Sequence, residues 1–203
     1  MNRREASKKE TRKLILDVAR RLFAVKGMEE CTIRDIARAA GVSPASVVVH
    51  FKSKTALLEV ALSSDIATEM SRAIASMPGD APLPDRLIHL ANRFFKFYDG
   101  NRNLYRAFIR STLLETAGET PNVTRVSDRY IEFLHGMIEE EKTRGVVRAE
   151  VDSMVVAASI FSLYLGALVT FFRVPEMTVE MTTDILAAMT NQYLEGIMTS
   201  ERG

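Results

Sequence analysis

The sequence predicts an all-α fold of about nine helices, with an N-terminal three-helix domain over residues 9–69 and a larger helical domain over residues 70–203. Apolar side chains recur every three or four residues along most of the chain, which is the period of an amphipathic helix. Strands would need alternating patterns and partner segments, and the chain offers neither. Gly and Pro, at 10 and 6 of 203 residues, are too sparse to interrupt many helices.

Two amphipathic helices open the chain. The stretch TRKLILDVARRLFAVKG predicts a helix capped by Thr11 and stopped by Gly27. The stretch CTIRDIARAAG predicts a helix of about two turns, in which Thr32 and Asp35 have the spacing of a capping box. The apolar face of the two helices consists of Ile15, Val18, Ala19, Leu22, Phe23, Ile33, Ile36, Ala37 and Ala40.

The stretch GVSPASVVVHFKSK contains three successive valines, which favour a strand, but its other signals favour a third short helix. Ser43 is a suitable N-cap, and Pro44 suits the first helical position because no N–H is needed there. Val47 and Phe51, four residues apart, then point to the core. The remaining side chains of this helix are small and face outward.

The rest of the chain predicts helices only. Ser53 caps a helix over 54–77, and the turn-rich stretch PGDAPLP ends it. Further amphipathic helices are predicted within residues 85–100, 103–118, 123–145 and 178–198. Between the helices predicted within 123–145 and 178–198 lies a further segment, within 152–176, whose helix would be apolar on almost every face.

That segment contains 19 residues without a charge, 154–172, and is nearly long enough to span a bilayer. Ser159, Ser162 and Thr170 interrupt it, and no basic cluster marks a cytoplasmic side. A helix that is apolar all round inside a water-soluble chain is buried on several sides. We therefore expect burial, partly against a second subunit, rather than a membrane span. The small residues that would let another helix approach are Ala158, Ser162, Gly166 and Thr170.

Charge divides the chain unevenly, although its net charge is only +1. Residues 1–60 contain 13 Lys and Arg against 7 Asp and Glu, and the remainder is acidic. A basic end suits contact with a polyanion, and it equally fits a solvated charged face. The single cysteine, Cys31, excludes an internal disulfide and fits a reducing, cytoplasmic location, where it serves as a small buried apolar residue.

Two short helices joined by Gly41-Val42-Ser43 and braced by a preceding helix form a helix-turn-helix pattern. Over residues 15–58 this pattern resembles, without a gap, the DNA-binding domain of TetR-type transcriptional regulators. The resemblance rests on Phe23, Gly27, Thr32, Ile33, Ile36, Ala37, Ala40, Gly41, Val42, Ser43, Phe51, Lys54 and Leu57. It implies a DNA-binding domain over 9–69 and an effector-binding and dimerisation domain over 70–203.

Within the resemblance, the third helix enters the major groove of DNA and the second crosses the backbone. Arg34 has the geometry to bind a guanine bidentately, and a phosphate contact is equally expected of it. Thr32 and Lys54, at helix N-termini, are expected at phosphates. The basic residues Arg3, Arg4, Lys8, Lys9 and Arg12 add non-specific attraction or are disordered. The full set of predicted DNA contacts is Thr32, Arg34, Ser43, Pro44, Ala45, Ser46, Val48, Val49, His50 and Lys54.

The sequence departs from the family at Val48, where an aromatic residue, most often tyrosine, usually packs on the DNA backbone. Valine cannot donate a hydrogen bond there, and His50 either supplies part of that contact or is a structural surface histidine. The groove geometry does not depend on this position.

The resemblance also implies a small, mostly apolar effector and a homodimer formed through the last two long helices. The residues predicted to line the effector site are Phe94, Phe108, Glu115, Leu134, Met137, Phe161 and Tyr164. The competing interpretation is that most of them are ordinary residues of the hydrophobic core. Glu115 would be a polar anchor on the helix face continued from Phe108. The predicted dimer contacts are Ala158, Ser162, Gly166, Ile185 and Met189. A repressor that binds a palindromic double-stranded operator follows from this arrangement.

The sequence offers no competing catalytic set. His50, His89 and His135 are isolated, no cluster has metal-ligand spacing, and no cofactor is expected. The chain is therefore predicted not to be an enzyme. The alternatives are an all-helical protein or enzyme that binds a small molecule without a DNA role, and a membrane-associated adaptor.

Overall fold

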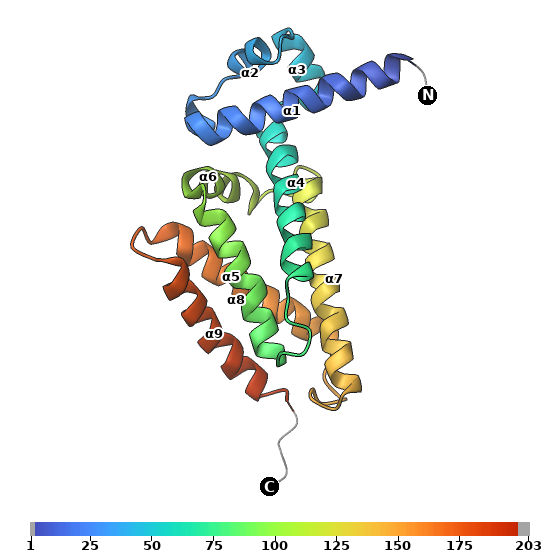
Figure 1. Ribbon diagram of the computed structural model, residues 1–203, viewed down its shortest axis with the longest axis vertical. Helices are drawn as coiled ribbons and strands as arrows, with labels where there is room; N and C mark the ends of the chain where they lie inside the picture. Colours follow the sequence, from blue (N-terminus) through green and yellow to red (C-terminus); the bar gives the residue numbers. More distant parts are fainter. Residues whose placement is uncertain (1–2, 199–203) are drawn as a thin grey trace. The chain divides into compact units, whose positions relative to one another are not determined.

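The computed structural model describes residues 3–198, and their regular secondary structure is helical (Figure 1). An isolated antiparallel bridge between Val147 and Met198 is the remaining pairing in this part of the chain. The all-α prediction is therefore confirmed. The helices are α1 (Arg3–Glu30), α2 (Ile33–Ala39), α3 (Pro44–Phe51), α4 (Lys54–Ala75), α5 (Leu83–Asp99), α6 (Arg102–Thr112), α7 (Pro121–Thr143), α8 (Ser153–Arg173) and α9 (Val179–Glu195).

The chain divides into two compact units. The first comprises the chain up to Ala67 together with Asn101–Arg125, so that it holds α1–α3, most of α4, α6 and the start of α7. The second comprises Thr68–Gly100 and the chain from Val126 onward, with α5, α8, α9 and most of α7. The division at residue 69 into two functional domains stays a prediction.

Helix α1 differs from its predicted bounds at both ends. It extends back to Arg3, so Thr11 is not its N-cap, and the Thr11 hydroxyl instead donates to the Ser7 carbonyl at 2.9 Å. The prediction failed because the preceding polar residues carry no apolar periodicity, although they are good helix formers. Gly27 has φ 76° and breaks the helical geometry as predicted, but helical residues follow it and α1 ends at Glu30 rather than at Gly27.

The first unit is held together by apolar packing and by ties to α1 and α4. The Arg20 guanidinium of α1 lies 3.2 Å from the Asp65 carboxylate and donates to the Ala61 carbonyl at 3.3 Å, which braces α1 on α4. Buried Glu59 of α4 accepts hydrogen bonds from the backbone amides of Asn122 and Val123 at 2.8 and 2.9 Å, and so caps α7. Cys31 is fully buried, as predicted, and burial raises the pKa of its thiol.

Helix α6 is shorter than the sequence predicts. It ends at Thr112, and the following residues form turns, so Glu115 does not continue the face of Phe108 and is exposed. The predicted helix was too long because Leu113 and Leu114 extend the apolar pattern, yet both are exposed and Leu114 is 95% exposed. The loop forms its own cap, in which the Glu119 carboxylate accepts from the amide and the hydroxyl of Thr116 at 3.1 and 2.8 Å.

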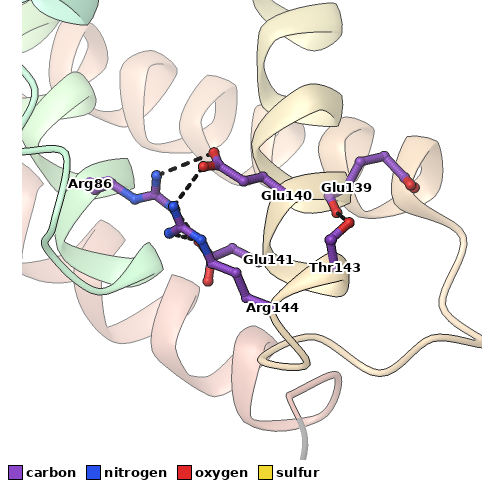
Figure 2. A network of polar contacts seen from close by, with 6 residues as sticks. All are labelled: Arg86, Glu139, Glu140, Glu141, Thr143 and Arg144. Atoms are coloured by element: carbon purple, nitrogen blue, oxygen red, sulfur yellow. Dashed lines mark hydrogen bonds and ion pairs between the residues drawn. The ribbon is translucent and has the colours of Figure 1, made fainter.

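In the second unit, α9 packs against both α5 and α8. A buried ion network joins α5 to α7 (Figure 2). Arg86, 3% exposed, binds the buried Glu141 carboxylate, which also receives Arg144 at 3.1 Å, while Arg144 reaches Glu140 at 2.7 Å. Such a network specifies how two helices meet, because each buried charge must keep its partner.

Helix α8 has 21 residues and is apolar enough to cross a membrane by length and composition alone, a test that core helices also pass. Its two faces differ. One face, including Val156, Ile160 and Phe171, is buried in the second unit. The other carries the small residues of the predicted stripe, Ala158, Ser162, Gly166 and Thr170, all of which are exposed.

Candidate nucleic-acid interface

The start of α2 is fixed by a reciprocal cap. The Thr32 hydroxyl accepts from the Asp35 amide at 3.1 Å, and the Asp35 carboxylate accepts from the Thr32 amide at 3.1 Å. This is the predicted capping box with Asp in the acidic position. Hydrogen bonds from Thr32 hold the pKa of the Asp35 carboxyl below its usual range, so the carboxylate is ionised and the cap persists at neutral pH.

The turn between α2 and α3 depends on Gly41. Its φ of 65° lies in the left-handed region, where a side chain would be strained. The Val42 amide then donates back to the Ala37 carbonyl at 3.0 Å. This bond satisfies a carbonyl at the end of α2 and sets the direction in which α3 begins.

Helix α3 begins and packs as the sequence predicts. The Ser43 hydroxyl accepts from the Ser46 amide at 3.1 Å, and Pro44 occupies the first turn. Val47 and Phe51 are buried. Arg12 of α1 secures the other end, because it donates to the His50 carbonyl at 3.1 Å and its guanidinium lies 4.3 Å from the centre of the Phe51 ring.

The outer face of α3 is small, apolar and uncharged. Pro44, Ala45, Val48 and Val49 are exposed, with Val49 at 76%, and Ser46 and His50 are half-buried. Burial and the nearby Lys8 and Arg12 lower the pKa of His50, so its imidazole is neutral at pH 7. A slim helix with exposed methyl groups fits the major groove, where a thymine presents its own methyl.

The polar residues predicted to contact DNA differ in whether their side chains are already bonded within the protein. Arg34 is exposed in the first turn of α2 and makes no hydrogen bond or ion pair within the described part of the chain. Both polar groups of Thr32 serve the capping box. The Lys54 ammonium donates to the Met28 carbonyl at 2.7 Å and keeps further N–H groups for a phosphate. Arg34 is the predicted contact with the most freedom to approach DNA.

Arg12 has a role in the site that its sequence position does not suggest. Its contacts to His50 and Phe51 join residues 38 and 39 positions apart. No local periodicity could have revealed them. The basic composition of residues 1–60 was the available signal, and it indicated only general attraction to a polyanion.

Several predicted effector residues gather in the second unit. Phe94 of α5, Tyr130 of α7 and Tyr164 of α8 form one aromatic cluster, with ring centres 5.8–6.1 Å apart. Phe161 lies 6.0 Å from Tyr130 by the same measure. Burial raises the pKa of the Tyr164 hydroxyl, which remains a neutral donor. Leu134 and Met137 are also buried there, whereas Phe108 and Glu115 belong to the first unit.

The predicted dimer residues of α8 and α9 are exposed in the second unit. Besides the small stripe on α8, the neighbouring α9 exposes Ile185 at 45% and Met189 at 37%. A Cβ added at Gly166 would meet no atom within 4 Å, which shows that the stripe faces open space in a single chain.

A serine and a histidine meet in the second unit, a contact that the sequence did not suggest. The Ser76 hydroxyl lies 3.1 Å from His89 Nε2. The same hydroxyl is also within hydrogen-bond distance of the Ala73 carbonyl, at 3.2 Å. Which of Ser76 and His89 donates depends on the tautomer of the imidazole. No group of three or more potential metal ligands occurs among residues 3–198.

Together the capped helix pair, the glycine turn and the exposed face of α3 define a DNA-binding protein of the helix-turn-helix class. Residues 15–61 match the family model described as bacterial regulatory proteins, tetR family. A relative, nucleoid occlusion factor SlmA of Haemophilus influenzae (strain PittGG), is 27% identical over 167 residues, which cover 81% of this chain and 77% of that protein. The HTH-type transcriptional regulator SrpR of Pseudomonas putida is 24% identical over 72% of this chain and 68% of its own length.

The fold extends the likeness beyond the DNA-binding domain. A putative transcriptional regulator from Saccharomonospora viridis, solved in complex with choline, superimposes with a TM-score of 0.66 at 22% identity, over 94% of this chain and 99% of that one. The chain is a DNA-binding transcriptional regulator, and its residues 15–61 are similar to the DNA-binding domain of the tetR family. Regulators of this family are generally non-enzymatic.

Proposed function

We infer that the protein is a cytoplasmic repressor that binds a palindromic operator as a homodimer and leaves it when a small, mostly apolar effector binds. The exposed face of α3 is the observation that carries this proposal. Val48 and Val49 are exposed to 47% and 76% on a helix whose other side is anchored in the core. Exposed valines are unfavourable in water and favourable against thymine methyl groups.

A homodimer follows from the operator and from the outer surface of the second unit. Two recognition helices must lie about one helical turn of DNA, 34–36 Å, apart to read a palindrome. The exposed stripe of α8 with Ile185 and Met189 of α9 supplies an apolar surface for a second copy. Small residues let the backbones of two helices approach closely.

The effector is proposed to bind among the aromatic residues of the second unit. Phe94, Leu134, Met137, Phe161 and Tyr164 supply an apolar lining with a neutral hydroxyl. The structural neighbour solved in complex with choline supports the proposal that a protein of this fold binds a small molecule. Release would follow if the effector favours a spacing of the two recognition helices that the operator does not accept.

Arg34→Ala tests the DNA side of the proposal. If Arg34 binds a guanine, the variant loses about 1–3 kcal/mol on the specific site and little on random duplex. The measurement is fluorescence anisotropy with a fragment from upstream of the protein's own start and with a random duplex of equal length. Arg38→Ala, the loss of another exposed arginine of α2, is the matched control. Equal losses on both duplexes would reduce Arg34 to a phosphate contact.

Gly166→Leu tests the dimer. The added side chain meets nothing in a single chain, so the fold should be retained and the helix even favoured over glycine. A close helix pair cannot accommodate it, and light scattering should report a monomer in place of a dimer. Glu195→Leu, an exposed position at the end of α9, controls for added apolar surface. An unchanged dimer would place the interface elsewhere.

A further inference from the structure

A groove in the first unit lies between the end of α1 and the helix α6. Its volume is about 590 Å³, which falls within the range of small-molecule sites. Residues 23–30 form one wall, and residues between 101 and 110 form the other. Phe23 and Leu104, at 0% and 4% exposed, are its buried apolar lining. The groove therefore offers a partly apolar cavity that no part of the DNA-binding face uses.

Two ties join the walls of this groove. The Asn101 side-chain amide donates to the Ala24 carbonyl at 3.2 Å, and the Arg110 guanidinium lies 2.9 Å from the Glu29 carboxylate. Arg106 lies between Asn101 and Arg110 along the chain and also lines the groove. The ties hold the walls on either side of Arg106, so the cavity around it is defined by the fold of this unit.

The α6 wall presents two polar side chains that the protein itself does not use. Asn103 and Arg106 are exposed, and neither makes a hydrogen bond or ion pair within residues 3–198. Their spacing of three residues places them on one side of α6, next to each other. A guanidinium presents parallel N–H groups that match a carboxylate, and an asparagine amide adds a further donor. The pair is suited to an organic acid.

The other charges of the groove limit the ligand to one negative charge. Lys26 lies 4.0 Å from the Asp35 carboxylate, and Arg110 is paired with Glu29, so Arg106 is the cation that remains available. Glu30, the last residue of α1, is exposed and lines the opposite wall. Its carboxylate would repel a second negative charge on the ligand.

We propose that this groove is a second small-molecule site, which binds an organic monocarboxylate with an apolar body. The carboxylate binds to Arg106 and Asn103, and the apolar body packs against Phe23 and Leu104. Binding the carboxylate fixes the orientation of the ligand, while the buried side chains contribute most of the contact area.

The groove is distinct from both sites described above. Its lining belongs entirely to the first unit, whereas the aromatic cluster belongs to the second. The groove also lies beside the DNA-binding helices, because the carbonyl of Met28 in its wall accepts from the Lys54 ammonium at 2.7 Å. The proposal goes beyond the proposed function, and it does not depend on effector binding in the second unit.

Cinnamate and its uncharged counterpart cinnamamide test the site. Each is titrated into the full chain by isothermal calorimetry at low salt. Cinnamate should bind about tenfold more tightly than cinnamamide, because hydrogen bonds to a charged group are stronger than those to a neutral one. Arg106→Gln should remove this difference by weakening cinnamate about tenfold, and it should leave cinnamamide unchanged.

Two further variants control for charge and for position. Arg21→Gln removes an exposed arginine of α1 that does not line the groove, and it should bind cinnamate as the unaltered protein does. Ala107→Leu enlarges a half-buried side chain of the lining and should weaken both ligands. Because Arg106 and Arg21 are exposed, their variants should keep the melting temperature of the unaltered protein.

The position of the bound probe is measured by amide chemical shifts of the isotope-labelled full chain. Cinnamate should shift residues within 23–30 and 101–110. Shifts confined to the second unit, equal affinity for acid and amide, or cinnamate binding that Arg106→Gln leaves unchanged would each overturn the site. An equal loss in Arg21→Gln and Arg106→Gln would also overturn it, since the attraction would then be general. None of these results would affect DNA binding through α3, which is measured separately.

Discussion

The helix-turn-helix and the aromatic region of the second unit are built by contacts of very different range. In the first, Thr32 contacts Asp35 and Ser43 contacts Ser46, three residues away, and Gly41 sets the turn by its own backbone conformation. In the second, the aromatic cluster draws its rings from α5, α7 and α8. Contacts between residues close in sequence can be predicted from the spacing of residue types. Contacts between helices far apart in the sequence form only when the chain folds, and local spacing does not predict them.

Breaking a long-range contact of the second unit should have the largest effect. Arg86→Ala removes the buried partner of Glu141, which lies 55 positions away in the sequence. A buried carboxylate without any partner costs about 3–5 kcal/mol. Because Glu141 keeps Arg144 at 3.1 Å, we expect the free energy of unfolding to fall by less, at most about 3 kcal/mol. Urea denaturation followed by circular dichroism measures it.

Two further variants sharpen this result. Glu140→Ala removes a half-exposed member of the same network and should cost at most about 1 kcal/mol. Replacing both buried partners, as Arg86→Met with Glu141→Leu, should recover most of the loss, because apolar residues of similar volume need no counter-charge. A loss below 1 kcal/mol in Arg86→Ala would show that the network contributes little to the second unit.

The sequence could predict the fold and the DNA-binding helices because each depends on neighbours along the chain. Apolar periodicity located the helices, and Ser43-Pro44 located the start of α3 despite its three valines. The same reasoning failed where the pattern of apolar residues did not match the helix that forms. The residues before Thr11 continue α1 without an apolar face, and Leu113 and Leu114 mimic a helix that ends at Thr112.

The side-chain details of the site were less accessible to sequence reasoning. Arg34 could be singled out, since it is a basic residue in the first turn of α2. The engagement of the Lys54 ammonium by the Met28 carbonyl, 26 positions away, could not. The same is true of the buried pair Arg86 and Glu141, which lie 55 positions apart. Charged residues are buried only with a partner, and the sequence does not name the partner.

The smallest expected effect concerns His50, where the locally built site depends on a distant part of the chain. Burial, Lys8 and Arg12 lower the pKa of His50 in the folded protein below the ordinary value of 6.5. The unfolded chain therefore binds more protons than the folded chain as the pH falls through 6.5 and below. Stability should be complete above that pH and decrease slightly toward pH 5.5, and His50→Gln should remove this component in thermal melts.

DNA binding should respond to the same titration with the opposite sign. If α3 binds DNA as proposed, a phosphate beside His50 favours the charged imidazole, so the pKa of His50 should rise in the complex and binding should take up a proton. Affinity for a random duplex should then increase as the pH falls from 7.5 to 6, at constant salt, and His50→Gln should flatten that dependence. His135→Gln, at a half-buried histidine of α7 in the second unit, is the control and should leave it intact. If affinity does not change with pH in the unaltered protein, His50 stays neutral on DNA and makes no charged contact with a phosphate.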